Sequence, residues 1–348
     1  MAEERFEVLD ALRGFAAIGV LFFHLSIVGA PQLAPHGYLA VDFFFMLSGF
    51  VLSHSYAERL QSGRLTVAKF LQIRMKRLLP LSLLGLLLGT GYFLLRLAIQ
   101  KYSQYALSDI LGGTAFNAAL LPKPWVSQAP TDTTFPTNTP MWSLSFEIAV
   151  NLLWAALISR LDTKCAWVIT AVTGGLLTLL ILKSGTADLG ATWTTFFGGA
   201  ARTLFGFFTG VLVWYYRPKP FLSAFLLWPT ILLLAIVFCI PIQSSVFDAV
   251  SVVLIFPLLM CLSVSCHLQQ KQRLLSVLGR LSYPLYIVHV PILMSTVGLL
   301  KATHLEQTAS RYLFALVPIC ILVAISLDKY YDSPIASVLG KHKVRSAL

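Results

Sequence analysis

The sequence predicts an all-α protein that lies in a membrane, crosses it about ten times and keeps both termini in the cytoplasm. Of its 348 residues, 57% are hydrophobic and only 12% are charged, which is unlike a soluble domain of this length. Apolar runs of roughly 18 to 22 residues recur from one end to the other, and each can cross a bilayer as a helix. Basic residues collect in alternate connections between these runs, which sets the predicted orientation.

The predicted spans follow one another with mostly short connections. They cover residues 11–28, 39–56, 78–97, 142–158, 165–183, 193–216, 221–239, 248–266, 283–299 and 311–328. The longest connection, 98–140, is predicted on the extracytoplasmic face; it can cover a cavity mouth, with "DILGGTAFNAALL" dipping in as a short amphipathic helix. We expect residues 1–348 to form a single membrane domain with a cytoplasmic tail, residues 329–348.

The formal charge of +11 raises the question of a nucleic-acid partner. If the N-terminus is cytoplasmic, 19 of the 26 Lys and Arg residues fall in cytoplasmic tails and loops, six fall outside, and Arg202 lies within a span. This uneven split is the positive-inside distribution of membrane proteins. The basic character therefore reflects topology, and we expect the lipid bilayer rather than nucleic acid as a partner.

The first apolar run has neither a signal-peptide flank nor a cleavage site. Residues Met1 to Val8 are polar and mixed in charge, and no small-residue cleavage motif follows the run, so we expect this span to be retained.

The five cysteines lie inside or at the ends of apolar runs, without C-x-x-C spacing. We interpret them as packing residues and predict no metal site.

Two polar residues stand in the first span. Ionisable side chains in a membrane cost roughly 2.5 to 3.5 kcal/mol each, so each needs a partner or a purpose. Arg13 and His24 are eleven residues apart, which places them on one helix face, about 16 Å apart in height. Arg13 is then near the cytoplasmic surface and His24 deep in the outer half. Taken singly, Arg13 can also be a snorkelling topology residue, and His24 can serve a helix–helix hydrogen bond.

Two carboxylates are predicted at the depth of His24. Asp42 lies in the first turn of the second span, and Glu147, in "TPMWSLSFE", lies about one turn into the fourth. A carboxylate beside an imidazole fixes its tautomer and raises its basicity, as a general base requires. We therefore predict that His24, Asp42 and Glu147 are catalytic, and we leave open which carboxylate faces His24. The alternative for Asp42 is a helix cap.

Basic and small residues on the next two helices suggest a path for an anionic ligand. Arg74 and Arg77, in "RMKRLLP", share a helix face beside Lys76, and guanidinium pairs suit phosphates. Lipid headgroup contact or topology is the alternative. Ser48 and Gly49, at the predicted bilayer midplane, can serve close helix packing or form a slot for an acyl chain or thioester arm.

Two further charged or titratable residues lie within predicted spans. Arg202 needs an anion, which Glu147, Asp42 or a ligand can supply; a buried structural salt bridge is the alternative. His289, two residues before Pro291, is interpreted as packing and hydrogen bonding to a kinked helix. The residues predicted to bind the anionic ligand are Arg13, Ser48, Arg74, Lys76, Arg77 and Arg202.

Taken together, these stretches resemble the membrane acyltransferase family 3, which includes bacterial O-antigen and other surface-polysaccharide O-acetyltransferases and macrolide acylases. The resemblance covers nearly the whole chain. Five motifs carry it in order: Arg13 with His24, "VDFFFMLSGF", Arg74 with Arg77, "PMWSLSFE" and "LSYPLYIVHVPI".

The resemblance implies ten core transmembrane helices in a bacterial inner membrane. It also implies transfer of an acyl group, usually acetyl, from cytoplasmic acyl-CoA to a hydroxyl on the other face, with no metal. The family histidine corresponds to His24 and its arginine to Arg13, while the R-x-x-R pair handles the donor. Many relatives add an extracytoplasmic hydrolase-like domain; this chain resembles the single-domain form, which delivers the acyl group itself or to a separate partner.

These implications combine with the residue positions into one mechanism. Arg74 and Arg77 hold acetyl-CoA phosphates, the thioester arm passes Ser48, and His24 deprotonates the acceptor; an acyl-histidine relay is the alternative. The expected acceptor is a carbohydrate, such as O-antigen or another surface polysaccharide, on which Trp125 can stack if it is not an interfacial anchor.

Two other classes of protein compete with this interpretation. One is a transporter or flippase for a lipid-linked sugar or small metabolite, and the other is a non-catalytic scaffold or sensor. No inverted repeat supports a transporter.

Overall fold

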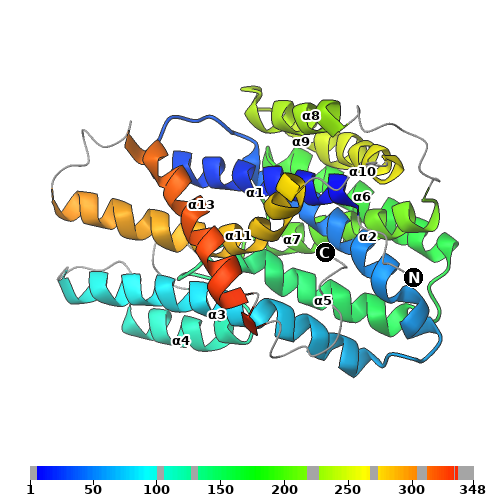
Figure 1. Ribbon diagram of the computed structural model, residues 1–348, viewed down its shortest axis with the longest axis horizontal. Coiled ribbons are helices and arrows are strands. Elements are labelled where there is room, and N and C mark those ends of the chain that lie inside the picture. Colours follow the sequence, from blue (N-terminus) through cyan, green and yellow to red (C-terminus); the bar gives the residue numbers. More distant parts are fainter. Residues whose placement is uncertain are drawn as a thin grey trace.

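The computed structural model describes residues 6–99, 106–126, 132–217, 227–266, 273–303, 312–332 and 334–335. Most of its helices lie along the long axis of the molecule (Figure 1), and the described residues form no β-strand beyond an isolated bridge between Thr133 and Thr192. The predicted all-α class is confirmed. Much of the predicted cytoplasmic tail, and the parts of the long connection at 100–105 and 127–131, lie outside the described residues.

The helices keep the order of the predicted spans. They are α1 (Glu7–Ile27), η1 (Gly37–Leu39), α2 (Ala40–Gln61), α3 (Val67–Ile99), α4 (Leu107–Ala118), α5 (Met141–Leu157), α6 (Thr163–Ser184), α7 (Phe196–Tyr215), α8 (Leu227–Cys239), α9 (Ser245–Val250), η3 (Ser251–Ile255), α10 (Phe256–Ser265), α11 (Arg273–Ala302), η4 (Tyr312–Ala315), α13 (Leu316–Leu327) and η5 (Asp328–Asp332). The segments α9, η3 and α10 follow one another without a break.

Among the described residues, eight helical stretches are long and apolar enough to cross a membrane. The two other predicted spans correspond to shorter apolar helices, α5 with 17 residues and α8 with 13. Each predicted span thus overlaps a helix, and the chain is a multi-pass membrane protein. The total of ten spans and the location of the termini stay predictions. We therefore call the side on which α1 begins the predicted cytoplasmic side.

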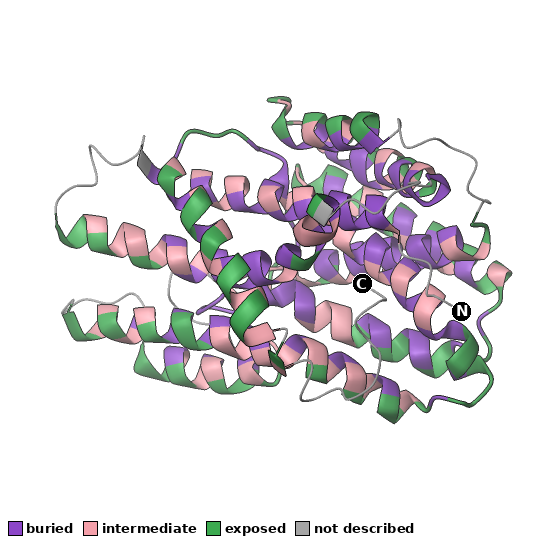
Figure 2. Ribbon diagram, viewed as in Figure 1, coloured by how far each residue is buried: buried purple, intermediate pink, exposed green. Residues whose placement is uncertain are grey.

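The centre of the bundle is formed by α1, α2 and α7. Within their most apolar windows 67%, 72% and 72% of the residues are buried, compared with 28% for α6 and 22% for the last stretch, which contains α13. Figure 2 shows the same contrast, with buried positions concentrated inside and exposed ones on α13. The helices that carry Arg13, Asp42 and Arg202 are therefore the most enclosed, where an uncompensated charge costs most.

The third helix begins earlier than its predicted span. α3 has 33 residues and starts at Val67 rather than at residue 78. Residues 67–77 are rich in Lys, Arg, Leu, Met and Gln, which favour helices, so the basic stretch continues the membrane helix. Arg74 and Arg77 consequently lie about one turn apart on one rigid element.

α2 and α7 touch backbone to backbone. A methyl group added at Gly49 of α2 would lie 1.9 Å from the carbonyl oxygen of Phe207, and one at Gly210 of α7 would lie 2.0 Å from that of Met46. Such close approach depends on small residues, as in other membrane helix pairs. Gly49 therefore serves packing, which is one of the two roles expected for Ser48 and Gly49.

The segment before α5 runs inside the bundle. Phe135 and Asn138 are both 1% exposed, and Met141, the first residue of α5, is 0% exposed. Asn138 Nδ2 donates to the carbonyl oxygen of Ile287 at 3.0 Å, an acceptor left free because Pro291, four residues on in α11, has no N–H. Irregular backbone at this depth is tolerated because protein surrounds it. α5 therefore begins inside the protein, near the middle of the molecule in Figure 1.

The long connection contains the expected short helix, α4. It packs against α3, and Asp109 in its first turn accepts a hydrogen bond from the indole N–H of Trp125 at 2.8 Å. The ring of Trp125 also stands edge-on to Phe116, with centroids 5.8 Å apart. Its contacts tie the connection to α4, while the stacking and anchoring roles of Trp125 stay predictions.

The boundaries of α6 follow from local chemistry. The carboxylate of Asp162 accepts a hydrogen bond from the backbone N–H of Cys165 at 2.7 Å, and this bond lowers the pKa of Asp162. At the other end Gly185 adopts a φ of 80°, a left-handed conformation that suits glycine and ends the helix.

The contact between α2 and α7 predicts a stability difference between two glycine substitutions. Gly49→Ala should destabilise the protein by about 1–3 kcal/mol, because the new methyl group meets the backbone of Phe207. Gly175→Ala is the matched control: it is also within a helix, but a methyl group there meets nothing within 4 Å. Thermal unfolding of detergent-purified protein measures both. Equal unfolding temperatures for the two variants would contradict the proposed packing.

Candidate active site

A cavity lies among α1, α2, α3, α5 and α11. It encloses about 1180 Å³ of empty space, part of it open solvent, and its wall carries the charged residues Asp10, Arg13, Arg74, Arg77 and Glu147. The three arginines lie in the first halves of α1 and α3, which begin on the predicted cytoplasmic side. The cavity therefore belongs to the half of the bundle where a cytoplasmic ligand is expected.

Two of these arginines have anionic partners. Arg74 Nη2 donates to Glu147 Oε1 at 2.7 Å, and the same oxygen accepts a hydrogen bond from the Ser48 hydroxyl at 3.1 Å. Arg13 Nη2 donates to Asp10 Oδ1 at 3.2 Å. The Nε atom of Arg74 is buried and has no hydrogen-bond partner among the described residues. Ser48 therefore faces the cavity, and Arg74 keeps one N–H for a further acceptor.

The third arginine lacks such a partner. Arg77 lines the cavity and has neither a hydrogen bond nor an ion pair with any residue that the structure describes; Asp332 acts on it at longer range. Lys76, which was expected to act with the arginines, is exposed and is not part of the cavity wall. A guanidinium without a close internal anion is available to an anionic ligand.

The far end of the cavity carries two hydroxyl groups. Ser143 Oγ and the Tyr286 hydroxyl are 2.8 Å apart, and they lie 3.1 and 3.2 Å from the carbonyl oxygen of Pro140. Phe44 stands edge-on to Tyr286, with centroids 5.7 Å apart. Each hydroxyl has one hydrogen, so one can stay on Pro140 while the other turns toward a ligand.

Two histidines meet beside this end of the cavity. His289 Nε2 of α11 lies 3.2 Å from His24 Nδ1 of α1, and the rings stand edge-on with centroids 4.8 Å apart. The Tyr286 ring is 6.0 Å from the His289 ring. We call His24 and His289 the histidine pair. Sequence reasoning treated His289 as a packing residue, although it lies in the motif "LSYPLYIVHVPI"; that motif was the available signal.

The expected contact between His24 and Glu147 is wrong. Glu147 bonds Arg74 and Ser48 at the cavity, whereas the hydrogen-bond partners of His24 among the described residues are His289 and the carbonyl oxygen of Val20. The prediction assumed that α5 starts at the outer surface of the membrane. Because α5 begins inside the protein, Glu147 reaches the arginines instead.

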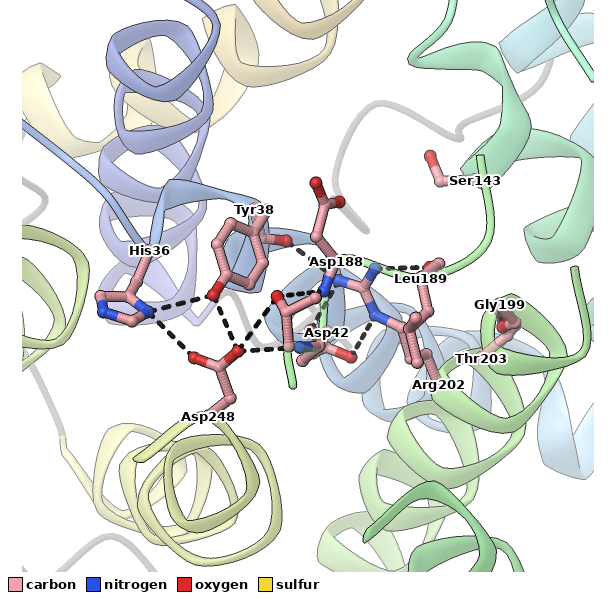
Figure 3. Close-up of polar contacts among 12 residues, drawn as sticks. His36, Tyr38, Asp42, Ser143, Asp188, Leu189, Gly199, Arg202, Thr203 and Asp248 are labelled. Carbon is pink, nitrogen blue, oxygen red and sulfur yellow. Dashed lines mark hydrogen bonds and ion pairs between the residues drawn. The ribbon is translucent and has the colours of Figure 1, made fainter. Parts of the chain in front are cut away.

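Asp42 is also not beside His24, because it forms a buried ion pair with Arg202. The Nε and Nη2 atoms of Arg202 donate to the two carboxylate oxygens at 3.0 and 2.8 Å, and both residues are 0% exposed. Arg202 also donates to the carbonyl oxygens of Leu189 and Tyr38 (Figure 3). Its guanidinium lies over the ring of Trp142. Arg202 thus forms a buried structural ion pair, which is the alternative to ligand binding that the sequence analysis gives for it. It does not line the cavity.

A second buried pair adjoins the first through Tyr38. His36 Nδ1 lies 2.9 Å from Asp248 Oδ1, and the Tyr38 hydroxyl donates to Asp248 Oδ2 at 2.7 Å (Figure 3). The other ring nitrogen of His36, Nε2, lies 2.9 Å from the carbonyl oxygen of Ile242. His36 and Asp248 are 212 residues apart in the chain, and no sequence signal pointed to their contact. We call the linked set the outer network; it consists of His36, Tyr38, Asp42, Arg202 and Asp248.

A comparison with known proteins identifies the family. The model of the acyltransferase domain family matches residues 6–329, nearly the whole chain. The chain belongs to this family. The resemblance found in the motifs is therefore confirmed, and the protein is a membrane acyltransferase rather than a transporter or a non-catalytic scaffold.

Individual relatives match parts of the acyltransferase. It is 35% identical over 184 residues to Protein 2 in the picA locus of Rhizobium radiobacter, which covers 49% of this chain and 91% of that protein. The chain is 30% identical over 180 residues to acyltransferase MdmB of Streptomyces mycarofaciens, and the match covers 47% of this chain and 42% of MdmB. It is 37% identical over 73 residues to O-acetyltransferase OatA of Staphylococcus aureus, and the match covers 21% of this chain and 11% of OatA. No solved structure matches the chain.

The buried ion pair predicts a stability defect in the acyltransferase. Asp42→Asn removes the anion and leaves the Arg202 guanidinium buried, a change that typically costs about 3–5 kcal/mol. We expect a lower unfolding temperature in detergent and less protein in the membrane. The double variant Asp42→Asn with Arg202→Met should recover part of the loss, because no unpaired charge remains.

The control is Glu58→Gln, which removes an exposed carboxylate from the same helix. A wild-type unfolding temperature for Asp42→Asn, or a double variant no better than the single one, would contradict the role assigned to the pair.

Proposed function

We propose that this acyltransferase is an O-acetyltransferase of the bacterial inner membrane. It takes an acetyl group from cytoplasmic acetyl-CoA and transfers it to a hydroxyl of a carbohydrate acceptor, such as O-antigen or another surface polysaccharide, on the extracytoplasmic side. Family membership supports acyl transfer. The similarity to OatA, an O-acetyltransferase, and to MdmB, an acyltransferase, supports acetyl as the group transferred and an ester as the bond formed.

The cavity suits the anionic donor. Arg77 has no close internal anion, and Arg74 keeps a buried N–H without a partner, so both can bind phosphate oxygens. Arg13 adds a third positive charge against the two carboxylates of Asp10 and Glu147. The wall therefore holds a net positive charge before any ligand binds, which favours a polyphosphate.

The length of the cavity region suits the thioester arm. Arg13 and His24 are separated by about 16 Å along α1, and Ser48 lines the wall on the way. At the far end the arm meets Tyr286, whose ring adjoins the histidine pair. The observation that carries the proposal is an arginine-lined cavity whose wall includes Tyr286, a residue whose ring lies 6.0 Å from that of His289, the partner of His24.

The chemistry uses His24 as the general base. His24 accepts the proton of the acceptor hydroxyl as the alcohol oxygen attacks the thioester carbonyl carbon. One of the two hydroxyls at the end of the cavity, that of Ser143 or that of Tyr286, donates to the carbonyl oxygen as it gains negative charge, while the other stays on the carbonyl oxygen of Pro140. The carbon–sulfur bond then breaks, and the CoA thiolate receives the proton from His24. No net proton remains on the protein.

The catalytic assignment is tested with radiolabelled acetyl-CoA and membranes from cells that produce the acceptor. The wild-type protein should incorporate label into a carbohydrate product, whereas His24→Ala should remove transfer because the base is gone. Thermal unfolding and membrane abundance of the variant serve as folding controls. An active His24→Ala protein, or label that crosses the membrane without forming an acetylated product, would overturn the proposal.

The donor assignment is tested by charge removal. Arg77→Gln should raise the KM for acetyl-CoA about tenfold, equivalent to roughly 1.4 kcal/mol, because one charged hydrogen-bonding group is lost from the cavity. Its kcat should change little, since Arg77 lies far from the reacting atoms. Lys69→Gln, an exposed cation on the same helix, is the matched control. An unchanged KM for Arg77→Gln would remove Arg77 from the donor site.

A further inference from the structure

The hydrogen-bond acceptors around the histidine pair determine where its hydrogens are. His289 Nδ1 lies 3.0 Å from the carbonyl oxygen of Leu285, which can only accept, so this nitrogen carries a hydrogen. In the neutral ring Nε2 is then an acceptor. That atom faces His24 Nδ1 at 3.2 Å, so the His24 nitrogen must donate.

A second acceptor leads independently to the same tautomer of His24. The carbonyl oxygen of Val20 lies 3.0 Å from His24 Nδ1 and also requires a hydrogen on that atom. The remaining nitrogen, His24 Nε2, is then unprotonated and has no hydrogen-bond partner among the described residues. His24 is only partly buried, so a lone pair of the ring is left for a ligand.

The surroundings favour two neutral rings before reaction. Among the described residues no carboxylate bonds either histidine, because Asp42 is held by Arg202 and Glu147 by Arg74. His289 is 1% exposed, so a charge placed on it would be buried without an anion.

We propose that His289 is a positioning residue that holds His24 in the tautomer whose Nε2 is the base. This rests on the proposed function, in which His24 takes the proton of the acceptor hydroxyl. When His24 becomes an imidazolium, its Nδ1–H donates to His289 Nε2 as a charge-assisted bond, which is stronger than the neutral one. The proton leaves again from His24 Nε2 to the CoA thiolate, so His289 neither gains nor loses a proton.

The position of His289 is itself fixed by the helix around it. Pro291 leaves the carbonyl oxygen of Ile287 without its helical donor, and Asn138 supplies that donor from the buried segment before α5. One residue earlier, the hydroxyl of Tyr286 bonds that of Ser143 in α5. These two bonds hold α11 within the turn that precedes His289, so its ring has a defined height against His24 of α1.

The first test compares two substitutions that differ in one hydrogen-bond acceptor. His289→Gln keeps an acceptor, its side-chain carbonyl, for His24 Nδ1–H, whereas His289→Leu has none. We expect kcat of His289→Leu to fall about 10- to 100-fold, with the KM for acetyl-CoA within about twofold of wild type. His289→Gln should keep kcat within about fivefold. Equal losses in the two variants, or none in His289→Leu, would overturn the proposal.

The second test reads the tautomer in the intact protein. Nitrogen NMR of histidine-labelled protein in lipid nanodiscs distinguishes protonated from unprotonated ring nitrogens, and the His24 signals are those missing from His24→Ala. We expect a protonated Nδ1 and an unprotonated Nε2 in the wild type, kept in His289→Gln. A wild-type His24 protonated at Nε2 would overturn the proposal even if a variant failed to fold.

The outcomes separate this inference from the proposed function. If His24→Ala still transfers acetyl groups, the base itself is misassigned. If His24→Ala is inactive while His289→Leu keeps the wild-type kcat, the base stands and only the positioning role of His289 fails.

Discussion

The buried ion pair between Asp42 and Arg202 links α2 to α7 and to the segments around them. A guanidinium that is 0% exposed inside a membrane protein needs a carboxylate, and Asp42 supplies both of its oxygens. Arg202 also bonds the carbonyl oxygens of Leu189 and Tyr38, so one side chain joins α2, α7 and two connections. Since the hydroxyl of Tyr38 donates to Asp248 of the second buried pair, the two pairs form one unit (Figure 3).

This use of Asp42 shapes the chemistry of His24. With Asp42 held by Arg202 and Glu147 held by Arg74, the imidazole of His24 meets a second imidazole instead of a carboxylate. Charge is thereby sorted by depth. Cations and carboxylates line the cavity, and the outer network lies outside its wall; under our proposals the first face the donor, and a neutral histidine pair lies between the two groups. A neutral middle suits a reaction in which the proton moves from an alcohol to a thiolate.

Sequence reasoning predicted the helices well, because length and apolar composition determine where a chain can cross a bilayer. It also identified five residues that line the cavity: Arg13, Ser48, Arg74, Arg77 and Glu147. It could not assign the partners of Ser48, Arg74 and Glu147, because these contacts join helices far apart in the chain. The error over Glu147 has a definite origin, since hydropathy cannot show that α5 starts inside the protein. His289 was interpreted without regard to other helices, although its proposed role depends on its contact with His24 of α1.

The position of the histidine pair has a consequence for the energetics of the whole membrane. Polar groups that approach each other from the two sides of a membrane can conduct protons across it. The driving force for such conduction is about 2.3 kcal/mol per charge for each 100 mV of membrane potential. Phe23 stands between His24 and Tyr38 of the outer network, with ring distances of 5.3 and 5.2 Å. The hydrogen bonds of the pair run from His24 to His289 and stop at the carbonyl oxygen of Leu285, which has no hydrogen to pass on. Under the proposed function, the pair exchanges a proton with its substrates at His24 Nε2, and among the described residues its hydrogen bonds do not continue to the outer network.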